Sequence, residues 1–252
     1  FPELAFVILT HPHEDHYKGL DTIIKRYPGK VKRMCWYSGD GIRELKHYIC
    51  QQKVAGRNVL PGFAEIIKTM QDAVKTGTQI RRLSELTLIA ESPCASLIAL
   101  SPSATNIKMY VKRLFKAIPQ TGKPVLPMND NEHNLISTAL FLKYGNVQAI
   151  FGSDLETTND RSGGGWNAII YNDDMPDLWA TFVKVPHHGS MTGYCDKAWD
   201  EHCKNNKPVS VITPFVKGNI YLPDENLIKL LKSKVDKLYL TSYPKLQPNI
   251  KY

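Results

Sequence analysis

The stretch Leu4–Gly19, LAFVILTHPHEDHYKG, decides the fold because a short apolar run leads directly into a cluster of ligand-type side chains. Residues 4–9 are rich in branched and aromatic side chains and contain neither Gly nor Pro, which predicts a buried β-strand. That strand delivers Thr10 and the histidines after it to one edge of a sheet. Residues 17–26 then predict an amphipathic helix.

The side chains that follow the strand have the spacing of a metal site. Alternate residues of an extended segment share a face, so His11 and His13 can converge on one cation while Pro12 stiffens the turn. Asp15 and His16 come after the bend and are expected to point at a second, adjacent position. Imidazole and carboxylate suit zinc, manganese or iron, and the lack of a nearby Cys argues against a purely structural thiolate site. A His-rich surface loop that binds nothing is the alternative, which the position directly after a strand disfavours.

Three motifs resemble one known family. The segment 11–16, HPHEDH, resembles the metal-binding signature of the metallo-β-lactamase superfamily. Residues 151–156, FGSDLE, resemble its strand end, where an Asp bridges both metals. Residues 185–190, VPHHGS, resemble a segment of the ComEC-type competence-channel branch. The resemblance runs from residue 4 to about 241 and is loosest between 40 and 95; it implies a four-layer αββα sandwich with a dinuclear metal site at one edge.

The resemblance also implies roles for individual residues. Two divalent ions, zinc or else manganese, would be held by His11, His13, Asp15, His16, Asp154 and His188. A metal-bridging hydroxide would attack a phosphodiester in line, with Asp15 and His187 as the catalytic groups. His187 would either bind the second cation or donate a proton to the leaving oxygen. Lys184, on the strand before VPHHGS, is expected to bind substrate.

The segment 132–137 leaves two interpretations open. Its Asn134-x-x-Ser137 spacing resembles an NxxS segment of the ComEC-type branch, whereas other superfamily members place a metal-binding His in this region. His133 is therefore either an additional ligand or a polar residue at the rim. Asn134, Ser137 and Ser190 are expected at the same rim.

Two features depart from the family pattern. The family's NxYxHP turn has a His where this chain has Leu222, which weakens the case for full activity. The chain also begins almost at the metal motif, whereas the family places one or more strands and a supporting Asp before it. Either those strands belong to a segment that has been omitted, lost or supplied by a protein partner, or the fold is incomplete; we expect omission.

Composition favours a single large domain of 252 residues, with a helical insertion at about residues 40–80. No apolar stretch approaches the length of a membrane span and no secretory leader is evident. The five Cys show no CxxC spacing, which favours reduced thiols and a cytoplasmic location, although ComEC-type relatives lie outside the membrane. The net charge of +8 favours a polyanionic partner such as nucleic acid; charges spread over solvated helix faces are the alternative.

The remaining pattern predicts the elements around these motifs. A hairpin is expected at 139–144 and 147–151, because Gly145-Asn146 between apolar runs favours a tight turn. The segment 107–118 predicts a basic helix that either lines a nucleic-acid groove or is simply solvated. Loops are expected at 121–130 and 157–166, and His47 is expected to have no special role. Further strands are expected at 31–37, 86–90, 96–100, 179–185, 209–213 and 237–241, and helices at 42–51, 63–74, 195–203 and 225–231.

Together these patterns predict a metal-dependent hydrolase, with nuclease or other phosphodiesterase activity favoured. A phosphodiesterase of small esters such as phosphocholine compounds is one alternative. A β-lactam or thioester hydrolase is another. The last is a regulatory module with a vestigial site, for which Leu222 is the best support.

Overall fold

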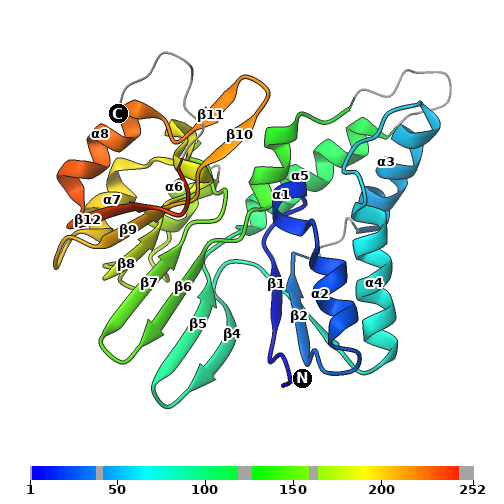
Figure 1. Ribbon diagram of the computed structural model, residues 1–252, viewed down its shortest axis with the longest axis horizontal. Helices are drawn as coiled ribbons and strands as arrows, with labels where there is room; N and C mark the ends of the chain where they lie inside the picture. Colours follow the sequence, from blue (N-terminus) through cyan, green and yellow to red (C-terminus); the bar gives the residue numbers. More distant parts are fainter. Residues whose placement is uncertain (1, 38–41, 119–126, 159–163, 244–252) are drawn as a thin grey trace. The chain divides into compact units, whose positions relative to one another are not determined.

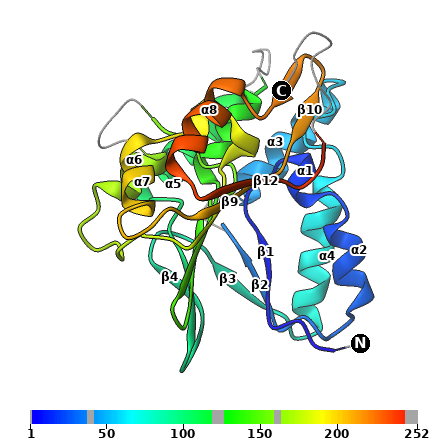
Figure 2. The ribbon, with the colours of Figure 1, turned by 60° about the vertical axis from the view of Figure 1, so that its left-hand side comes forward.

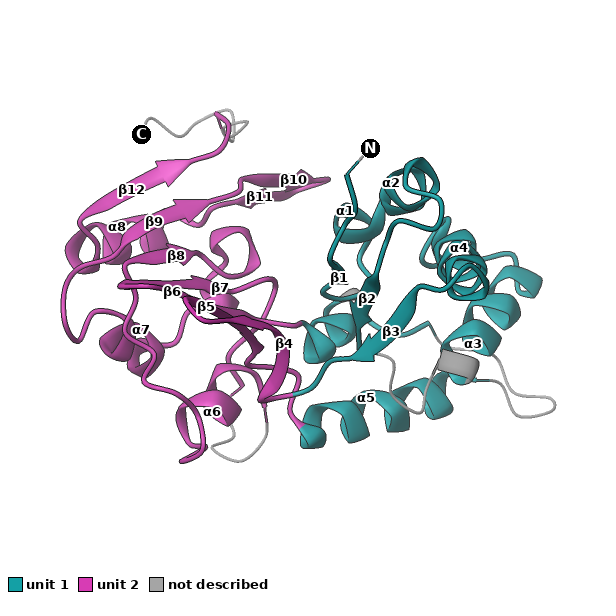
Figure 3. Cartoon of the chain, turned by 90° about the horizontal axis from the view of Figure 1, so that it is seen from below, with its two compact units in different colours: residues 1–84, 104–137 teal, residues 85–103, 138–252 magenta. Residues whose placement is uncertain are grey.

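The computed structural model describes residues 2–37, 42–118, 127–158 and 164–243, which divide into two compact units (Figure 3). Unit 1 comprises residues 1–84 and 104–137, and unit 2 comprises residues 85–103 and 138–252. Each unit has its own sheet and its own helices, so the chain is a mixed α/β protein with one large mixed sheet. The stacking of two sheets into four layers, and the single domain, stay predictions.

Unit 1 is built on a parallel three-stranded sheet in the order β1-β2-β3. Its register pairs Val7 with Met34 and Leu9 with Trp36. The helices α2 and α4 lie side by side next to this sheet (Figures 1 and 2). The bounds of the elements are β1 Val7–Leu9, α1 Glu14–Tyr17, α2 Leu20–Arg26, β2 Arg33–Trp36, α3 Ile42–Val54, α4 Phe63–Lys75, β3 Gln79–Arg82, α5 Ala104–Ala117 and the 3-10 segment η1 Asp130–Ile136.

The core of unit 1 lies between that sheet and the helices. Phe63 of α4 is fully buried, with its ring centroid 4.9 Å from Tyr17 and 5.7 Å from Trp36. Tyr110 and Leu114 of α5 are buried in the same cluster. Tyr17 ends α1, so this core also fixes the turn that carries the metal motif.

The prediction of one helix over residues 17–26 is wrong at its N-terminal end. Lys18 is extended and Gly19 has a φ of 85°, a left-handed conformation that glycine adopts without strain and that interrupts the helix. The segment therefore forms two short helices, α1 and α2. Asp15 and His16 therefore lie on the helix α1 rather than ahead of the first helix.

Unit 2 is built on a seven-stranded sheet in the order β12-β9-β8-β7-β6-β5-β4, with helices packed against it (Figure 1). Strands β4 to β7 are antiparallel, and β7, β8, β9 and β12 are parallel. The bounds are β4 Thr87–Ser92, β5 Ala95–Ala99, β6 Leu140–Tyr144, β7 Val147–Phe151, α6 Gly165–Ile170, β8 Phe182–Lys184, η2 His187–Gly189, η3 Met191–Gly193, α7 Asp196–His202, β9 Val209–Ile212, β10 Phe215–Lys217, β11 Ile220–Leu222, α8 Glu225–Lys234 and β12 Lys237–Leu240.

The order of strands in unit 2 brings two predicted motifs to one sheet edge. β7 and β8 are parallel neighbours, so the segments after them, 152–156 and 186–190, leave the sheet side by side. The amide of His187 donates to the carbonyl of Ser153 at 2.7 Å. A Cβ at Gly152 would lie 2.5 Å from the Pro186 side chain, so only glycine permits this approach.

Most of the other predicted elements are confirmed. The tight hairpin is present, with Tyr144 paired with Val147, and the helices α3, α4, α7 and α8 overlap their predicted ranges. The strand predicted at 179–185 is limited to Phe182–Lys184, and α5 begins at Ala104. Much of the two expected loops, residues 121–126 and 159–163, lies outside the described residues.

Two further predictions concern the chain as a whole. Within the described ranges, no helix combines the length and the apolar character needed to cross a membrane. All five cysteines lie in these ranges and are free thiols.

Candidate metal centre

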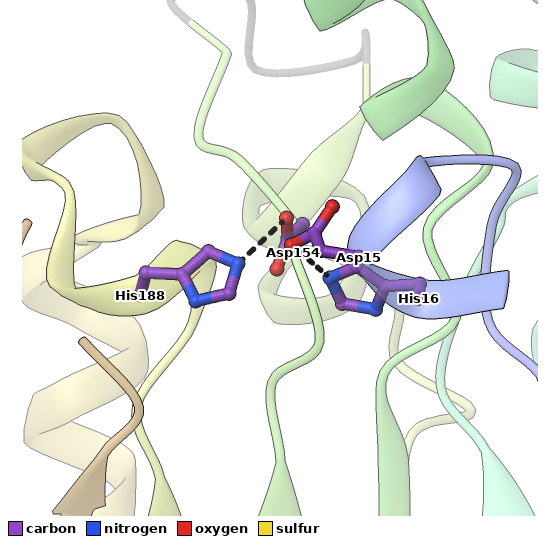
Figure 4. Close-up of side chains that lie close together, drawn as sticks. All are labelled: Asp15, His16, Asp154 and His188. Carbon is purple, nitrogen blue, oxygen red and sulfur yellow. Dashed lines mark ion pairs between the residues drawn. The ribbon is translucent and has the colours of Figure 1, made fainter. Parts of the chain in front are cut away.

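In unit 1 the metal motif folds into a compact group of imidazoles. His11 is completely buried, and its ring centroid lies 4.6 Å from that of His13 and 4.1 Å from that of His16. His16 also lies 3.5 Å, Nε2 to Oδ2, from Asp15 on the same short helix (Figure 4). The turn from β1 into α1 thus brings together the four ligand-type side chains that the sequence singled out.

Two hydroxyl groups support these rings. Thr10 Oγ1 lies 3.2 Å from Nδ1 of His11 and 3.2 Å from Nδ1 of His16. Ser137 Oγ, at the end of η1, lies 3.5 Å from the same His11 nitrogen. With Nδ1 engaged in this way, Nε2 is the ring nitrogen suited to bind a cation.

His133 is a buried neighbour of this group. Its side chain is 3% exposed, its Nδ1 lies 2.9 Å from the Tyr110 hydroxyl, and its ring centroid lies 5.7 Å from that of His13. Burial, with a smaller contribution from His13, lowers the pKa of His133 to about 3. The imidazole is therefore neutral at physiological pH, which is the state that a metal ligand needs. Asn134 is also buried beside it.

In unit 2 His188 is held from two sides. Its Nδ1 lies 2.9 Å from the carbonyl oxygen of Thr213, which accepts the ring N–H and leaves Nε2 available to bind a cation. Its ring stacks on Phe215 of β10 at a centroid distance of 4.9 Å and an angle of 28°. His188 Nε2 lies 3.5 Å from Oδ2 of Asp154, whose side chain is buried (Figure 4).

His187 belongs to a different network. Its Nδ1 lies 3.1 Å from Oε1 of Glu156 and 2.9 Å from Oγ1 of Thr192. The Thr192 hydroxyl in turn donates to Glu156 at 3.0 Å and lies 3.0 Å from the hydroxyl of Ser190. A carboxylate that orients an imidazole through Nδ1 leaves Nε2 to transfer a proton, which is the arrangement of a general acid or base.

The backbone of both unit 2 segments is strained. Ser153, His187 and His188 have φ values of 47°, 45° and 54°, which side-chain-bearing residues rarely adopt. Gly189 follows at 83°, and a Cβ there would lie 2.6 Å from Pro223. Such strain costs of order 1–3 kcal/mol per residue and concentrates at functional sites.

The other predicted positions lie around these groups. The Lys184 ammonium donates to the carbonyl of Val185 at 3.1 Å. Leu222, at the predicted His position, ends β11 and pairs with Phe215. His47 is exposed on α3.

Several supporting residues were missed by the sequence analysis. Glu156 lay within a motif but had no assigned role, and its partner Thr192 follows VPHHGS by two positions. Thr213 and Phe215 are some 25 residues from His188 and carry no local signal. The position of Thr10 between a strand and two histidines was the one available hint.

Among the described residues, each unit contains imidazoles and carboxylates that are suited to bind a metal ion. Because all of them offer nitrogen or oxygen donors, these side chains are able to bind a divalent metal ion. They are His11, His13, Asp15 and His16 in unit 1 and Asp154 and His188 in unit 2.

Comparison with known proteins gives a likeness among solved structures but no match to a family or to a curated protein. No protein-family model matches the chain. No curated protein matches it either. Among solved structures, the CmlA beta-hydroxylase E377D mutant aligns with a TM-score of 0.46 at 12% identity, over 97% of this chain. The chain spans 44% of the length of that protein, and its chemistry therefore rests on its own residues.

Proposed function

We propose that the chain is a metal-dependent hydrolase of the metallo-β-lactamase superfamily, of the ComEC type, that cleaves nucleic-acid phosphodiester bonds. We name the residues 10–16 of unit 1 the first half-site, and residues 153–156 with 187–192 of unit 2 the second half-site. In this proposal the two half-sites together hold two divalent cations. The five free thiols suit a reducing compartment such as the cytoplasm.

One observation carries the proposal: in each half-site, imidazoles are held by Nδ1 beside a carboxylate. In the first half-site, the Thr10 hydroxyl contacts Nδ1 of His11 and of His16, and Asp15 lies next to His16. In the second half-site, the Thr213 carbonyl contacts Nδ1 of His188, which lies next to Asp154. Metal-binding histidines in proteins are almost always oriented in this way through the second ring nitrogen. A histidine-rich surface loop would have no need for buried rings or for such partners.

The cations, when bound, would lower the pKa of a shared water and neutralise charge on a phosphoryl oxygen. His11, His13, Asp15, His16, Asp154 and His188 would hold them.

The other residues act on the substrate. His187, oriented by Glu156, would donate a proton to the leaving oxygen, and Lys184 and Ser190 would contact the substrate at the rim. His133 would either add a ligand or pack against His13. The net charge of +8 suits a polyanionic substrate.

The proposal is tested by turnover of a panel of substrates. The wild-type chain and an Asp154→Asn variant are incubated with zinc or manganese and with single-stranded DNA, plasmid DNA, RNA, a phosphocholine ester and a β-lactam. We expect cleavage of nucleic acid that a chelator abolishes and that the variant lacks. The matched control is Asp173→Asn, which changes an exposed carboxylate of unit 2 and should retain activity.

The other outcomes separate the alternatives. Turnover of the phosphocholine ester without nucleic-acid cleavage would replace the nuclease by a small-ester phosphodiesterase. Turnover of the β-lactam alone would show that the enzyme hydrolyses carbonyl compounds such as β-lactams or thioesters rather than phosphodiesters. Indifference to chelator and to Asp154→Asn would overturn the catalytic proposal in favour of a regulatory module.

A further inference from the structure

The outward face of α5 carries a row of positive charges. The inward face of this helix packs Tyr110 and Leu114 into the core of unit 1. Lys108, Lys112 and Lys116 are exposed on the opposite face at intervals of four residues. Since a helix rises 1.5 Å per residue, these lysines form a row about 12 Å long.

No acidic residue interrupts this row, because α5 contains no Asp or Glu. Arg113, further round the helix, is paired with Glu132 at 3.3 Å. Many other surface lysines are paired with carboxylates, such as Lys18 with Glu14 and Lys75 with Asp72. Among the residues that the structure describes, the lysines of the α5 row have no ion-pair partner.

An aromatic ring lies on the same face. Phe115 is 56% exposed, although it belongs to the residue types most often buried. At 100° per residue its direction falls between those of Lys108 and Val111, next to the lysine row. Ammonium groups that track a phosphate backbone, with an aromatic ring on which a base can stack, are the elements of a surface for single-stranded nucleic acid.

We propose that Lys108, Lys112, Phe115 and Lys116 form a docking surface for single-stranded nucleic acid, here named the α5 face. Its lysines contact phosphates and its Phe115 stacks on an unpaired base. The inference rests on the proposed function for the class of substrate, but binding at this face requires no catalysis.

Two other partners fit the α5 face less well. A helix that lies in a membrane surface needs a continuous apolar side to insert, and the apolar side of α5 is already buried in unit 1. A duplex could neutralise the lysines, but its bases are paired and stacked and offer nothing to Phe115. The exposed ring therefore favours the single strand.

The lysine row is tested by the salt dependence of binding. Fluorescence anisotropy of a labelled oligothymidylate is measured with the full chain in chelator, which prevents cleavage. Loss of three phosphate contacts should reduce the slope of log K against log salt by about 2, at about 0.7 per contact. We expect this smaller slope for the triple variant in which Lys108, Lys112 and Lys116 are each replaced by Gln.

A matched triple variant controls for net charge. Lys229→Gln, Lys232→Gln and Lys237→Gln remove the same charge from exposed positions of unit 2. This control should keep the wild-type slope. Equal slopes for both triple variants, or tighter binding to anionic phosphatidylserine vesicles than to the oligonucleotide, would overturn the proposal.

The aromatic contact is tested separately. Phe115→Ala should weaken binding to oligothymidylate about tenfold without changing the salt slope. It should not weaken binding to an abasic strand of the same length. An equal loss on both strands, or a wild-type preference for duplex, would contradict the role of Phe115 in stacking on a base.

Turnover of a small activated phosphodiester separates this inference from the proposed function. The α5 triple variant should cleave bis-p-nitrophenyl phosphate at the wild-type rate while losing affinity for the oligonucleotide. Wild-type turnover with unchanged oligonucleotide binding in the variant would sink the α5 face and leave the hydrolase proposal intact. Specific binding at the α5 face without any turnover would support the α5 face and contradict the hydrolase proposal.

Discussion

A single hydroxyl group supports two candidate ligands in the first half-site. Thr10 Oγ1 lies 3.2 Å from Nδ1 of both His11 and His16. Partners of this kind set the tautomer and the orientation of a metal-binding ring, and their loss commonly lowers metal affinity about 10- to 100-fold.

Thr10→Val should therefore weaken zinc binding by about 10- to 100-fold, because valine keeps the branched shape but removes the hydroxyl. Titration against a competing chromophoric chelator measures the affinity. Thr22→Val, at an exposed position of α2, is the control and should bind like wild type. Unchanged affinity in Thr10→Val would show that the hydroxyl does not orient the rings.

Glu156 contacts Nδ1 of His187, as Thr10 contacts Nδ1 of His11 and His16. Their ion-pair distance of 3.1 Å, with Thr192 bridging, fixes the Nδ1 side of the ring. General acid catalysis contributes about 10²–10⁴-fold when the leaving group is a poor one, and little when the leaving group is stable as an anion.

Glu156→Gln should lower kcat for a DNA phosphodiester by about 10- to 100-fold, a part of the general-acid contribution. It should leave KM and the turnover of bis-p-nitrophenyl phosphate close to wild type, because p-nitrophenolate needs no proton. Glu91→Gln, an exposed change on β4, is the control. Equal losses on both substrates would assign Glu156 a structural role instead.

For individual residues, the sequence predicted the candidate ligands but not the residues that orient them. The spacing of His11, His13, Asp15 and His16 after a strand is a local signal, and their convergence in unit 1 is a local consequence. Phe215 and Thr213 meet His188 only because β9 is the parallel neighbour of β8. That pairing is a property of the sheet and has no trace in the sequence near His188.

Among the elements, α7 carries a buried histidine that links stability to pH. His202 is 2% exposed, lies 5.6 Å from both Trp166 and Trp199 between ring centroids, and donates Nδ1–H to the Leu178 carbonyl at 3.0 Å. Burial lowers its pKa from 6.5 to about 4, although the Leu178 hydrogen bond acts in the opposite direction.

The folded and unfolded chains bind different numbers of protons at His202, so the free energy of unfolding depends on pH. Between pH 6.5 and about 4 the unfolded chain protonates this imidazole and the folded chain does not, so acid favours unfolding. The free energy of unfolding should fall by roughly 3 kcal/mol over this window because of His202 alone.

Denaturant unfolding at a series of pH values tests this, with His202→Gln compared with wild type. The variant should be less stable at pH 7 but should lose less stability on acidification. The exposed His47→Gln is the control and should keep the wild-type pH slope. Parallel curves for wild type and His202→Gln would refute the assignment.

Elements with strong periodicity were predicted well, and short or exposed ones were not. The hairpin at Gly145-Asn146 and the helices α3 and α4 have clear turn and helix signals. All four residues of β3 are exposed, so its sequence QIRR lacks the alternation of a half-buried strand. β10 and β11 contain three residues each, which is too short for a periodic signal.

For the whole molecule, the candidate ligands are divided between two separately packed units. The motif of residues 11–16 belongs to unit 1, while Asp154 and His188 belong to unit 2. The order of the motifs in the sequence supports one shared centre. From the resemblance of these motifs we propose that residues of both units bind the cations.

The most direct test is the metal content of the whole chain. The protein is loaded with zinc, dialysed against metal-free buffer and analysed for metal and protein together. About two ions per chain are expected for wild type and for Asp173→Asn, as for other two-metal hydrolases. His13→Gln in unit 1 and Asp154→Asn in unit 2 should each lose at least one ion. Wild type without stoichiometric metal, or full metal content in both ligand variants, would contradict the shared centre.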